Sequence, residues 1–188
     1  MDAPAGGAGT PGAPDPGAPL TFGIAIAVPE PHGAALQAHR ASFGDPLADQ
    51  IPSHITLLPP DVVRADALAE LEDRLAQVAA RTPRFRVALR GTGTFRPVSP
   101  VVFVAVSHGI AESELLADDL RATISAPASA FPYHPHVTVA HHLEDDALDR
   151  AYDTLADFAC AFDVEQLVLY LHRADAGWVQ HRRFALTG

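Results

Sequence analysis

Hydrophobic and polar residues alternate in two short stretches of the chain that resemble each other, SHITLLPP and PHVTVAHH. Successive side chains of a β-strand point to opposite faces, so His54 and Thr56 would share one face of a strand. His136 and Thr138 would share one face of a second strand in the same way. The residues between them are apolar, which predicts two strands that are buried behind and polar in front.

The remaining hydrophobic periodicity predicts the other elements of the fold. Apolar and β-branched runs predict strands at 21–29, 84–91, 100–108, 162–173 and 178–186. Apolar residues three or four apart predict helices at 31–43, 66–81, 111–126 and 144–159. Asp66 is the expected N-cap of the second helix, and Pro59 and Pro60 are expected to close the first polar-faced strand. The GTGT stretch from Gly91 is expected to form a turn or a bulge.

Both halves of the chain repeat one order: strand, helix, His-x-Thr strand, helix, strand. Phe22 precedes His54 by nearly the same interval that separates Phe103 from His136, which indicates an internal duplication. The predicted fold class is α+β, a bilobal pseudo-two-fold duplication in which antiparallel sheets line a central cleft and helices lie outside. One domain would span 21–186, its lobes being roughly interleaved halves, 21–99 and 100–186.

The first 20 residues are rich in Pro, Gly and Ala and are expected to form a disordered tail. The chain shows no signal-peptide pattern and no apolar run of membrane-spanning length, so we expect a cytoplasmic protein without a membrane partner. The single cysteine, Cys160, forms no internal disulfide and is expected to pack in an amphipathic helix beside Phe158.

The formal net charge is −10, and all 13 basic residues are arginines. An acidic chain repels a long polyphosphate backbone, which argues against an extended nucleic-acid surface. The composition still allows a local site to bind one phosphate group or the end of a nucleic acid.

Two histidines that flank a groove are suited to general acid–base catalysis. Their ordinary pKa near 6.5 lets one be neutral and one protonated near pH 7. The neighbouring threonine hydroxyls can donate hydrogen bonds to an anionic oxygen held between the rings. This arrangement suits in-line displacement at phosphorus, and it needs no nucleophilic side chain, metal or other cofactor.

The two His-x-Thr motifs, together with YHPHVTVA and TFRPVSPVVFVAV, resemble the 2H phosphoesterases, specifically the bacterial 2′-5′ RNA ligase-like branch. The resemblance covers about 21–186. It implies a monomeric, metal-independent cyclic phosphodiesterase that acts on 2′,3′-cyclic phosphate ends of nucleotides or RNA, and so a role in RNA processing. It implies four catalytic residues: His136 to activate water, His54 to protonate the leaving ribose oxygen, and Thr56 and Thr138.

The chain departs from the family's pattern after the second motif. Many relatives carry an arginine there, where this sequence has His141 and His142. A fixed positive charge would then have to come from elsewhere, and Arg96, Arg173 and Arg182 are the candidates.

Two other functions fit parts of the pattern. The cleft could bind a nucleotide without turning it over. Alternatively, His134, His136 and His142 have the same parity along a strand and could bind a metal, as in a cupin; this leaves the first motif unexplained. Tyr133 could stack on a base of the substrate, although packing against the preceding Phe131-Pro132 turn explains it at least as well. Phe95 and Trp178 could stack in the same way, but packing in the core is the favoured explanation for both.

Overall fold

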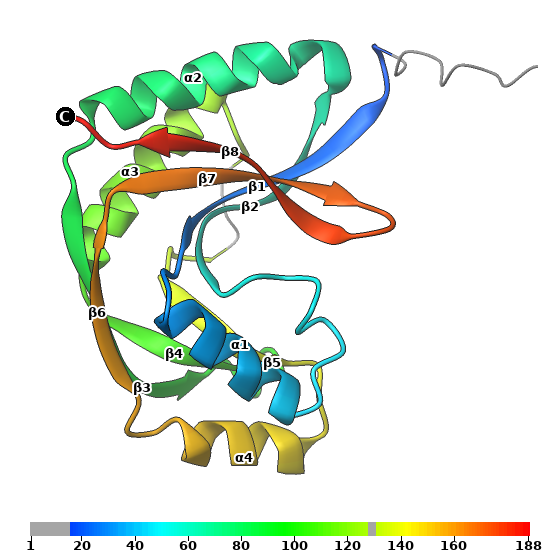
Figure 1. The fold of residues 1–188 in the computed structure, drawn as a ribbon, viewed down its shortest axis with the longest axis vertical. Coiled ribbons are helices and arrows are strands. Elements are labelled where there is room, and N and C mark those ends of the chain that lie inside the picture. The colour runs from blue at the N-terminus through cyan, green and yellow to red at the C-terminus, as the bar shows by residue number, and fades with distance from the viewer. Residues whose placement is uncertain (1–15, 128–130) are drawn as a thin grey trace, which may run out of the picture.

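Two antiparallel four-stranded sheets and four α-helices make up the described part of the protein (Figure 1). The structure is a computed structural model that describes residues 16–127 and 131–188. The strands are β1 (Pro19–Ala27), β2 (His54–Arg64), β3 (Phe85–Thr94), β4 (Val101–His108), β5 (His136–His141), β6 (Ala159–Val164), β7 (Gln166–Arg173) and β8 (Gly177–Ala185). The helices are α1 (His32–Ser42), α2 (Leu68–Arg81), α3 (Ile110–Ile124) and α4 (Asp145–Thr154). The α+β duplication predicted from the sequence is confirmed.

The two halves of the chain exchange strands between the two sheets. One sheet has the order β2-β1-β7-β8 and the other has the order β5-β4-β3-β6. Strand β3, from the first half, therefore pairs with β4, while β7, from the second half, pairs with β1. Figure 1 shows β6 and β7 running in succession from the lower lobe to the upper lobe. Each lobe is thus built from strands of both halves of the chain.

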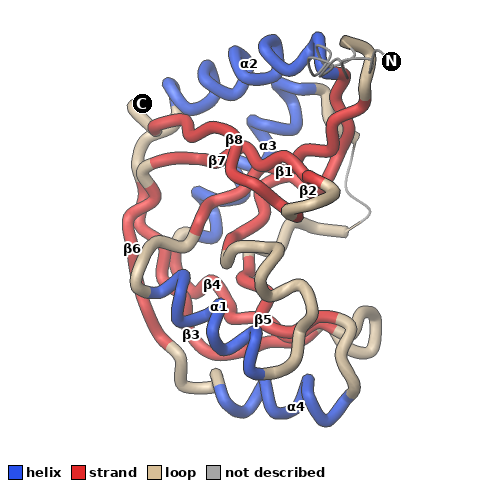
Figure 2. The backbone as a smooth tube through the Cα atoms, turned by 45° about the vertical axis from the view of Figure 1, so that its right-hand side comes forward, coloured by secondary structure: helices blue, strands red, loops and turns tan. Residues whose placement is uncertain are grey.

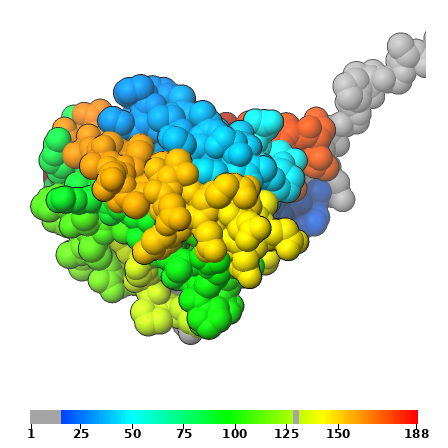
Figure 3. Space-filling model, turned by 90° about the horizontal axis from the view of Figure 1, so that it is seen from below, coloured from blue at the N-terminus to red at the C-terminus, as the bar shows by residue number. Residues whose placement is uncertain are grey.

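Helices α2 and α4 lie at opposite ends of the molecule, outside the two sheets (Figure 2). Helix α2 packs on β8, and α4 packs on β3, β4 and β5. The other two helices cross between the halves: α1 contacts β5, and α3 contacts β2. Seen from below, α1 and the yellow and orange residues of the second half lie side by side on the surface (Figure 3). Each motif strand is therefore supported by a helix from the opposite half.

The motif strands have the predicted alternation of buried and exposed faces. Ile55 and Val137 are fully buried, whereas His54 and His136 are partly exposed. Both strands lie at the edges of their sheets and contact each other. One continuous hydrophobic core includes buried residues of both lobes, so the lobes form a single folding unit.

Three boundaries differ from the expectations. Most of the predicted disordered tail lies outside the described residues, but β1 begins at Pro19, so the last two tail residues belong to a strand. Helix α4 ends at Thr154, and Cys160 lies half-buried in β6 opposite Leu89 rather than in a helix. The strand predicted at 162–173 is divided by Glu165 into β6 and β7.

Strand β2 continues through the two prolines that were expected to end it. A proline has no backbone N–H, but an edge strand tolerates one because one side of the strand needs no donor. Asp66 lies in a 3₁₀ turn and forms an ion pair with Arg64 instead of capping α2. The bulge expected near Gly91 is present, since the β3–β4 register shifts between Leu89 and Thr92.

No helix in the described ranges is long and apolar enough to cross a membrane.

A buried ion pair fixes the segment that leads from α1 to β2. Nε of Arg40 donates to Oδ2 of Asp45 at 2.7 Å, and the side chains are 4% and 0% exposed. Oδ1 of Asp45 accepts a hydrogen bond from the backbone N–H of Leu47. The carboxylate thus joins the end of the helix to the loop before His54.

Replacing Asp45 with Ala should lower the free energy of unfolding by about 3–5 kcal/mol, because the Arg40 charge would remain buried without a partner. Urea denaturation measures this change. The control is Asp163→Ala, which removes an exposed ion pair with Arg86 and should change stability by at most about 1 kcal/mol. Equal effects of the two substitutions would contradict the structural role of the buried pair.

Candidate active site

The two motif histidines are oriented by the same local hydrogen bond. Nδ1 of His54 lies 2.6 Å from the carbonyl oxygen of Pro52, and Nδ1 of His136 lies 2.7 Å from that of His134. A carbonyl oxygen only accepts, so Nδ1 carries the hydrogen in each ring. In the neutral rings Nε2 then has a free lone pair, which is the state a general base requires.

Burial lowers the pKa of both histidines below the ordinary value. For His54 the loss of solvent dominates, and the nearby Arg40 charge lowers the pKa further. For His136 the loss of solvent again dominates, with additional lowering by His134 and by His54 itself. In both rings the backbone hydrogen bond offsets part of the effect. The two imidazoles therefore influence each other, and both favour the neutral form until an anion binds.

Aromatic rings explain much of the burial of His136. Its ring meets Phe95 edge-on at a centroid distance of 5.0 Å and lies 5.1 Å from Phe103. His54 has a looser neighbour, Tyr170, at 6.5 Å. Phe95 is thus a direct neighbour of a motif histidine.

Two cavities adjoin the motif residues and share Thr56. The first, which we call the His54 cavity, is lined by Gly23, Ile24, Ala25, Ile51, Pro52, His54, Thr56, Leu58, Pro60, Tyr170 and Trp178. The second, the His136 cavity, is lined by Thr56, Leu57, Pro59, Phe95, Val98, Ser99, Arg121, Phe131, Pro132, Tyr133, His134 and His136. Thr56 therefore lies between the two cavities.

The lobes differ in the residue that lies opposite each threonine. Thr56 on β2 pairs with Ala25 on β1, whereas Thr138 on β5 pairs with Phe103 on β4. Directly paired residues share a face of the sheet, so a methyl group stands beside Thr56 and a phenyl ring beside Thr138. Thr138 shares the face of His136 but lines neither cavity.

Tyr133 connects the second motif to the first. Its hydroxyl donates a hydrogen bond to the backbone carbonyl of Thr56 at 3.0 Å. Burial raises its pKa, so the hydroxyl stays protonated at neutral pH. The ring forms part of the wall of the His136 cavity, and base stacking there stays a prediction.

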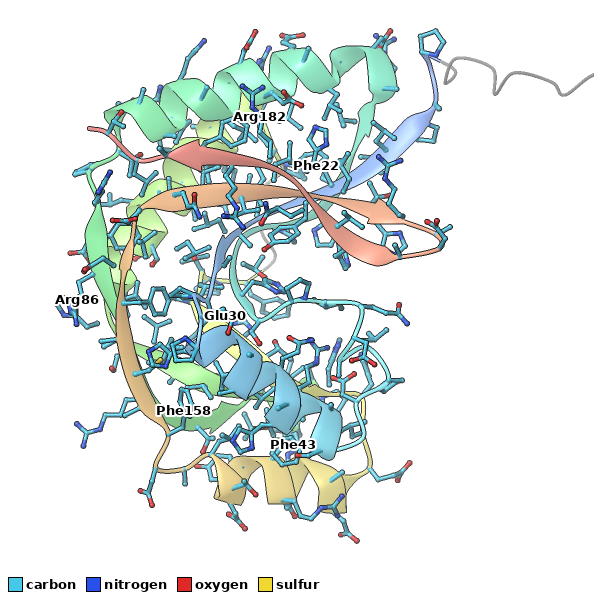
Figure 4. All side chains as sticks on the ribbon, in the orientation of Figure 1. Phe22, Glu30, Phe43, Arg86, Phe158 and Arg182 are labelled. Atoms are coloured by element: carbon cyan, nitrogen blue, oxygen red, sulfur yellow. The ribbon has the colours of Figure 1, made fainter. Side chains whose placement is uncertain are left out.

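The three arginines considered from the sequence do not line either cavity within the described ranges. Arg96 binds Asp145 and Asp149, and Arg182 binds Glu72 beneath α2 (Figure 4). Arg121 on α3, which sequence analysis missed, does line the His136 cavity. Arg121 follows buried Ala117 by one helical turn and so lies on the same face of α3. The sequence alone does not show which face of this helix is buried.

The three histidines of the metal hypothesis do not form a group. Strand β5 ends at His141, and His142 has a positive φ of 53°, with its ring 4.0 Å from that of His141. The parity that would align His142 with His136 is therefore lost. In the part of the chain that the structure describes, no three His, Cys, Asp or Glu side chains are placed to hold a metal ion.

A duplicated α+β fold that places two His-x-Thr strands against each other is the architecture of a two-histidine phosphoesterase. Residues 28–176 match the family model described as the 2′-5′ RNA ligase superfamily. The chain belongs to this family, as the resemblance of its motifs implied.

Individual relatives agree with this assignment. A Bacillus anthracis protein named as a phosphoesterase is 25% identical over 146 residues, which are 76% of this chain and 83% of the relative. The structure of Escherichia coli LigT with NADP⁺ has a TM-score of 0.66 and 26% identity, covering 91% of this chain and 100% of LigT. The complex of LigT with 3′-AMP gives a TM-score of 0.62 at 22% identity, with 91% and 100% covered.

Replacing Tyr133 with Phe should destabilise the protein by about 0.5–1.5 kcal/mol, because the Thr56 carbonyl would lose its side-chain donor. Urea denaturation gives the change in the free energy of unfolding. Tyr152→Phe is the control, since Tyr152 is 38% exposed on α4. A Tyr133→Phe protein as stable as the control would argue against the bridge between the motif strands.

Proposed function

We propose that this phosphoesterase opens 2′,3′-cyclic phosphate ends of nucleotides or RNA, using His54 and His136 as an acid–base pair. The observation that carries the proposal is the identical orientation of the two imidazoles by backbone carbonyls at the starts of equivalent strands. Both motifs come from one chain, so a monomer suffices. We expect the protein to act in the cytoplasm in RNA processing.

In the proposed reaction, Nε2 of His136 takes a proton from a water molecule as the water oxygen attacks phosphorus. The bond from phosphorus to one ribose oxygen breaks, and protonated His54 gives its proton to that oxygen. One water is consumed, and the product is a ribose phosphate monoester beside a free hydroxyl. Thr56 and Thr138 donate hydrogen bonds to the non-bridging oxygens.

The electrostatics of the site suit this division of labour. Both histidines have a lowered pKa in the empty site, which favours a neutral base. The negative charge of a bound phosphate favours protonation of one ring, and that ring becomes the acid. The substrate itself would thus complete the acid–base pair.

The ligands of a relative support a nucleotide substrate. Escherichia coli LigT has been solved with NADP⁺ and with 3′-AMP, both of which contain ribose and phosphate. The His136 cavity, with a volume of about 450 Å³, leaves room for a nucleoside beside the motif residues.

Replacing either His54 or His136 with Ala should lower kcat at least about 100-fold on adenosine 2′,3′-cyclic phosphate, since general acid–base catalysis contributes roughly 10²–10⁴-fold. The dependence of kcat/KM on pH should be bell-shaped with its maximum on the acidic side of pH 6.5, because both pKa values are lowered in the free enzyme. His136→Ala should remove the acidic limb and His54→Ala the basic limb.

His181→Ala is the control, because this histidine binds Glu72 away from both cavities. Retention of wild-type turnover in His136→Ala would refute the mechanism. Loss of the basic limb in His136→Ala and of the acidic limb in His54→Ala would reverse the two roles. Tight nucleotide binding without turnover of any cyclic nucleotide would identify a binding module instead. Activity that is abolished by EDTA would contradict metal-independent chemistry.

Replacing Thr56 with Val should lower kcat/KM by roughly 10–150-fold, the equivalent of about 1.5–3 kcal/mol for a hydrogen bond to a charged group. Thr56→Ser keeps the hydroxyl and should be mild. Thr138→Val should have the smaller effect, because Thr138 lies beside Phe103 and lines neither cavity. Steady-state kinetics on one cyclic nucleotide compares the three variants. An unchanged kcat/KM in Thr56→Val would show that Thr56 does not bind the phosphate.

A further inference from the structure

Arg121 is the one permanently charged side chain among the described residues that line the two cavities. It projects from α3 into the wall of the His136 cavity, where the remaining lining is mostly apolar or aromatic. Its side chain is 21% exposed, so the charge is only partly screened by water.

Arg121 lies where the His136 cavity meets a second cavity, since it lines both. The two cavities also share Pro59 and Phe131, and the second cavity contains none of the motif histidines or threonines. The charge of Arg121 acts on Tyr133, whose pKa it lowers in part, whereas the charges that act on His136 are those of His134 and His54. An anion bound by Arg121 would therefore be different from the phosphate held between the histidines.

The part of the His136 cavity between Arg121 and His136 is suited to a nucleoside. Phe95, Val98 and Pro132 provide apolar walls, and Tyr133 closes one side through its hydrogen bond to β2. Aromatic and apolar surfaces hold bases by stacking without reading their sequence.

The existing partner of Arg121 is weak. Nη1 lies 2.7 Å from Oδ1 of Asp118, three residues earlier on the same helix, and this carboxylate is 62% exposed. Exposed ion pairs of this kind contribute about 0–1 kcal/mol, so a phosphate can compete for the guanidinium. A guanidinium also presents several donors in a planar fork that matches phosphate oxygens.

We propose that Arg121 binds the 5′-phosphate of the nucleoside whose 2′,3′-cyclic phosphate lies between the two histidines. The preferred substrates are then nucleoside 2′,3′-cyclic phosphates that carry a phosphate on the 5′ oxygen. The terminal nucleotide of an RNA has this chemistry, because its 5′ oxygen belongs to the preceding phosphodiester. The placement of the cyclic phosphate rests on the proposed function.

A single fixed charge agrees with the charge balance of the chain. The formal net charge of −10 disfavours contact with many phosphates, and one arginine recognises one flanking phosphate without attracting a long duplex. The site would therefore read the last nucleotide of a strand.

The experiment compares two substrates that differ only in one group: adenosine 2′,3′-cyclic phosphate with and without a 5′-phosphate. Wild-type protein should have a kcat/KM at least about tenfold higher for the 5′-phosphorylated form, as expected for a hydrogen-bonded charge pair. Arg121→Gln should abolish this preference by lowering kcat/KM about tenfold more on the 5′-phosphorylated form than on the unphosphorylated form, and Arg121→Lys should keep part of the preference. Arg86→Gln is the matched control: Arg86 points outward from the far side of the sheet and pairs with Asp163 (Figure 4).

Equal losses on both substrates in Arg121→Gln would overturn the proposal, as would an unchanged preference. If wild-type protein turns over neither cyclic nucleotide, the proposed function fails. The role of Arg121 is then tested separately by measuring nucleotide binding with calorimetry. Arg121→Gln should weaken the binding of adenosine 3′,5′-bisphosphate about tenfold and leave that of adenosine 3′-monophosphate unchanged. Equal weakening of the two, or no weakening, would overturn the role of Arg121.

Discussion

The pairing of β1 with β7 and of β4 with β3 holds the two halves of the chain together, and the site depends on it. Each pairing joins a strand from one half to a strand from the other. Strands β3 to β6 form one sheet, and this segment separates β1 and β2 from β7 and β8 of the other sheet. Because β7 and β3 occupy the inner positions, β2 and β5 are left at the sheet edges, where they contact each other. The histidines stand at the first residues of these two strands, and the crossed pairing therefore sets their proximity.

Within this frame, the two lobes supply equivalent backbones but different side chains. Both imidazoles are turned by a carbonyl two residues earlier, which is a property of the local chain and is duplicated with it. The residues across the sheet are not duplicated: a small residue stands opposite one threonine and a phenylalanine opposite the other. The electrostatics differ as well, because Arg40 acts on His54 while aromatic rings surround His136. A symmetric fold thus carries an asymmetric site, as the proposed acid–base reaction requires.

Much of this could be predicted from the sequence, because alternation and helical spacing are local signals. The buried and exposed faces of both motif strands, the bulge near Gly91 and the strand expected at 178–186 follow from such patterns. The sequence indicated that the two halves interleave, but not which strands pair, since pairing partners depend on tertiary packing rather than on local sequence. Cys160 was misplaced because Phe158 continues the helical spacing of α4, although the helix has already ended at Thr154. Arg121 was missed because a charged residue on a helix is ordinarily exposed, and only the docking of α3 on β2 turns it inward.

The prolines within β2 have a consequence for the shape of the whole molecule. Two edge strands that contact each other could in principle join, which would merge the sheets into one continuous surface and close the space between the histidines. Pro59 and Pro60 cannot donate backbone hydrogen bonds, and the carbonyl of Thr56 already accepts one from Tyr133. The same residues make β2 a poor template for a strand from another molecule, which protects an exposed edge from aggregation. The backbone chemistry of one strand thus favours two separate sheets over one continuous sheet.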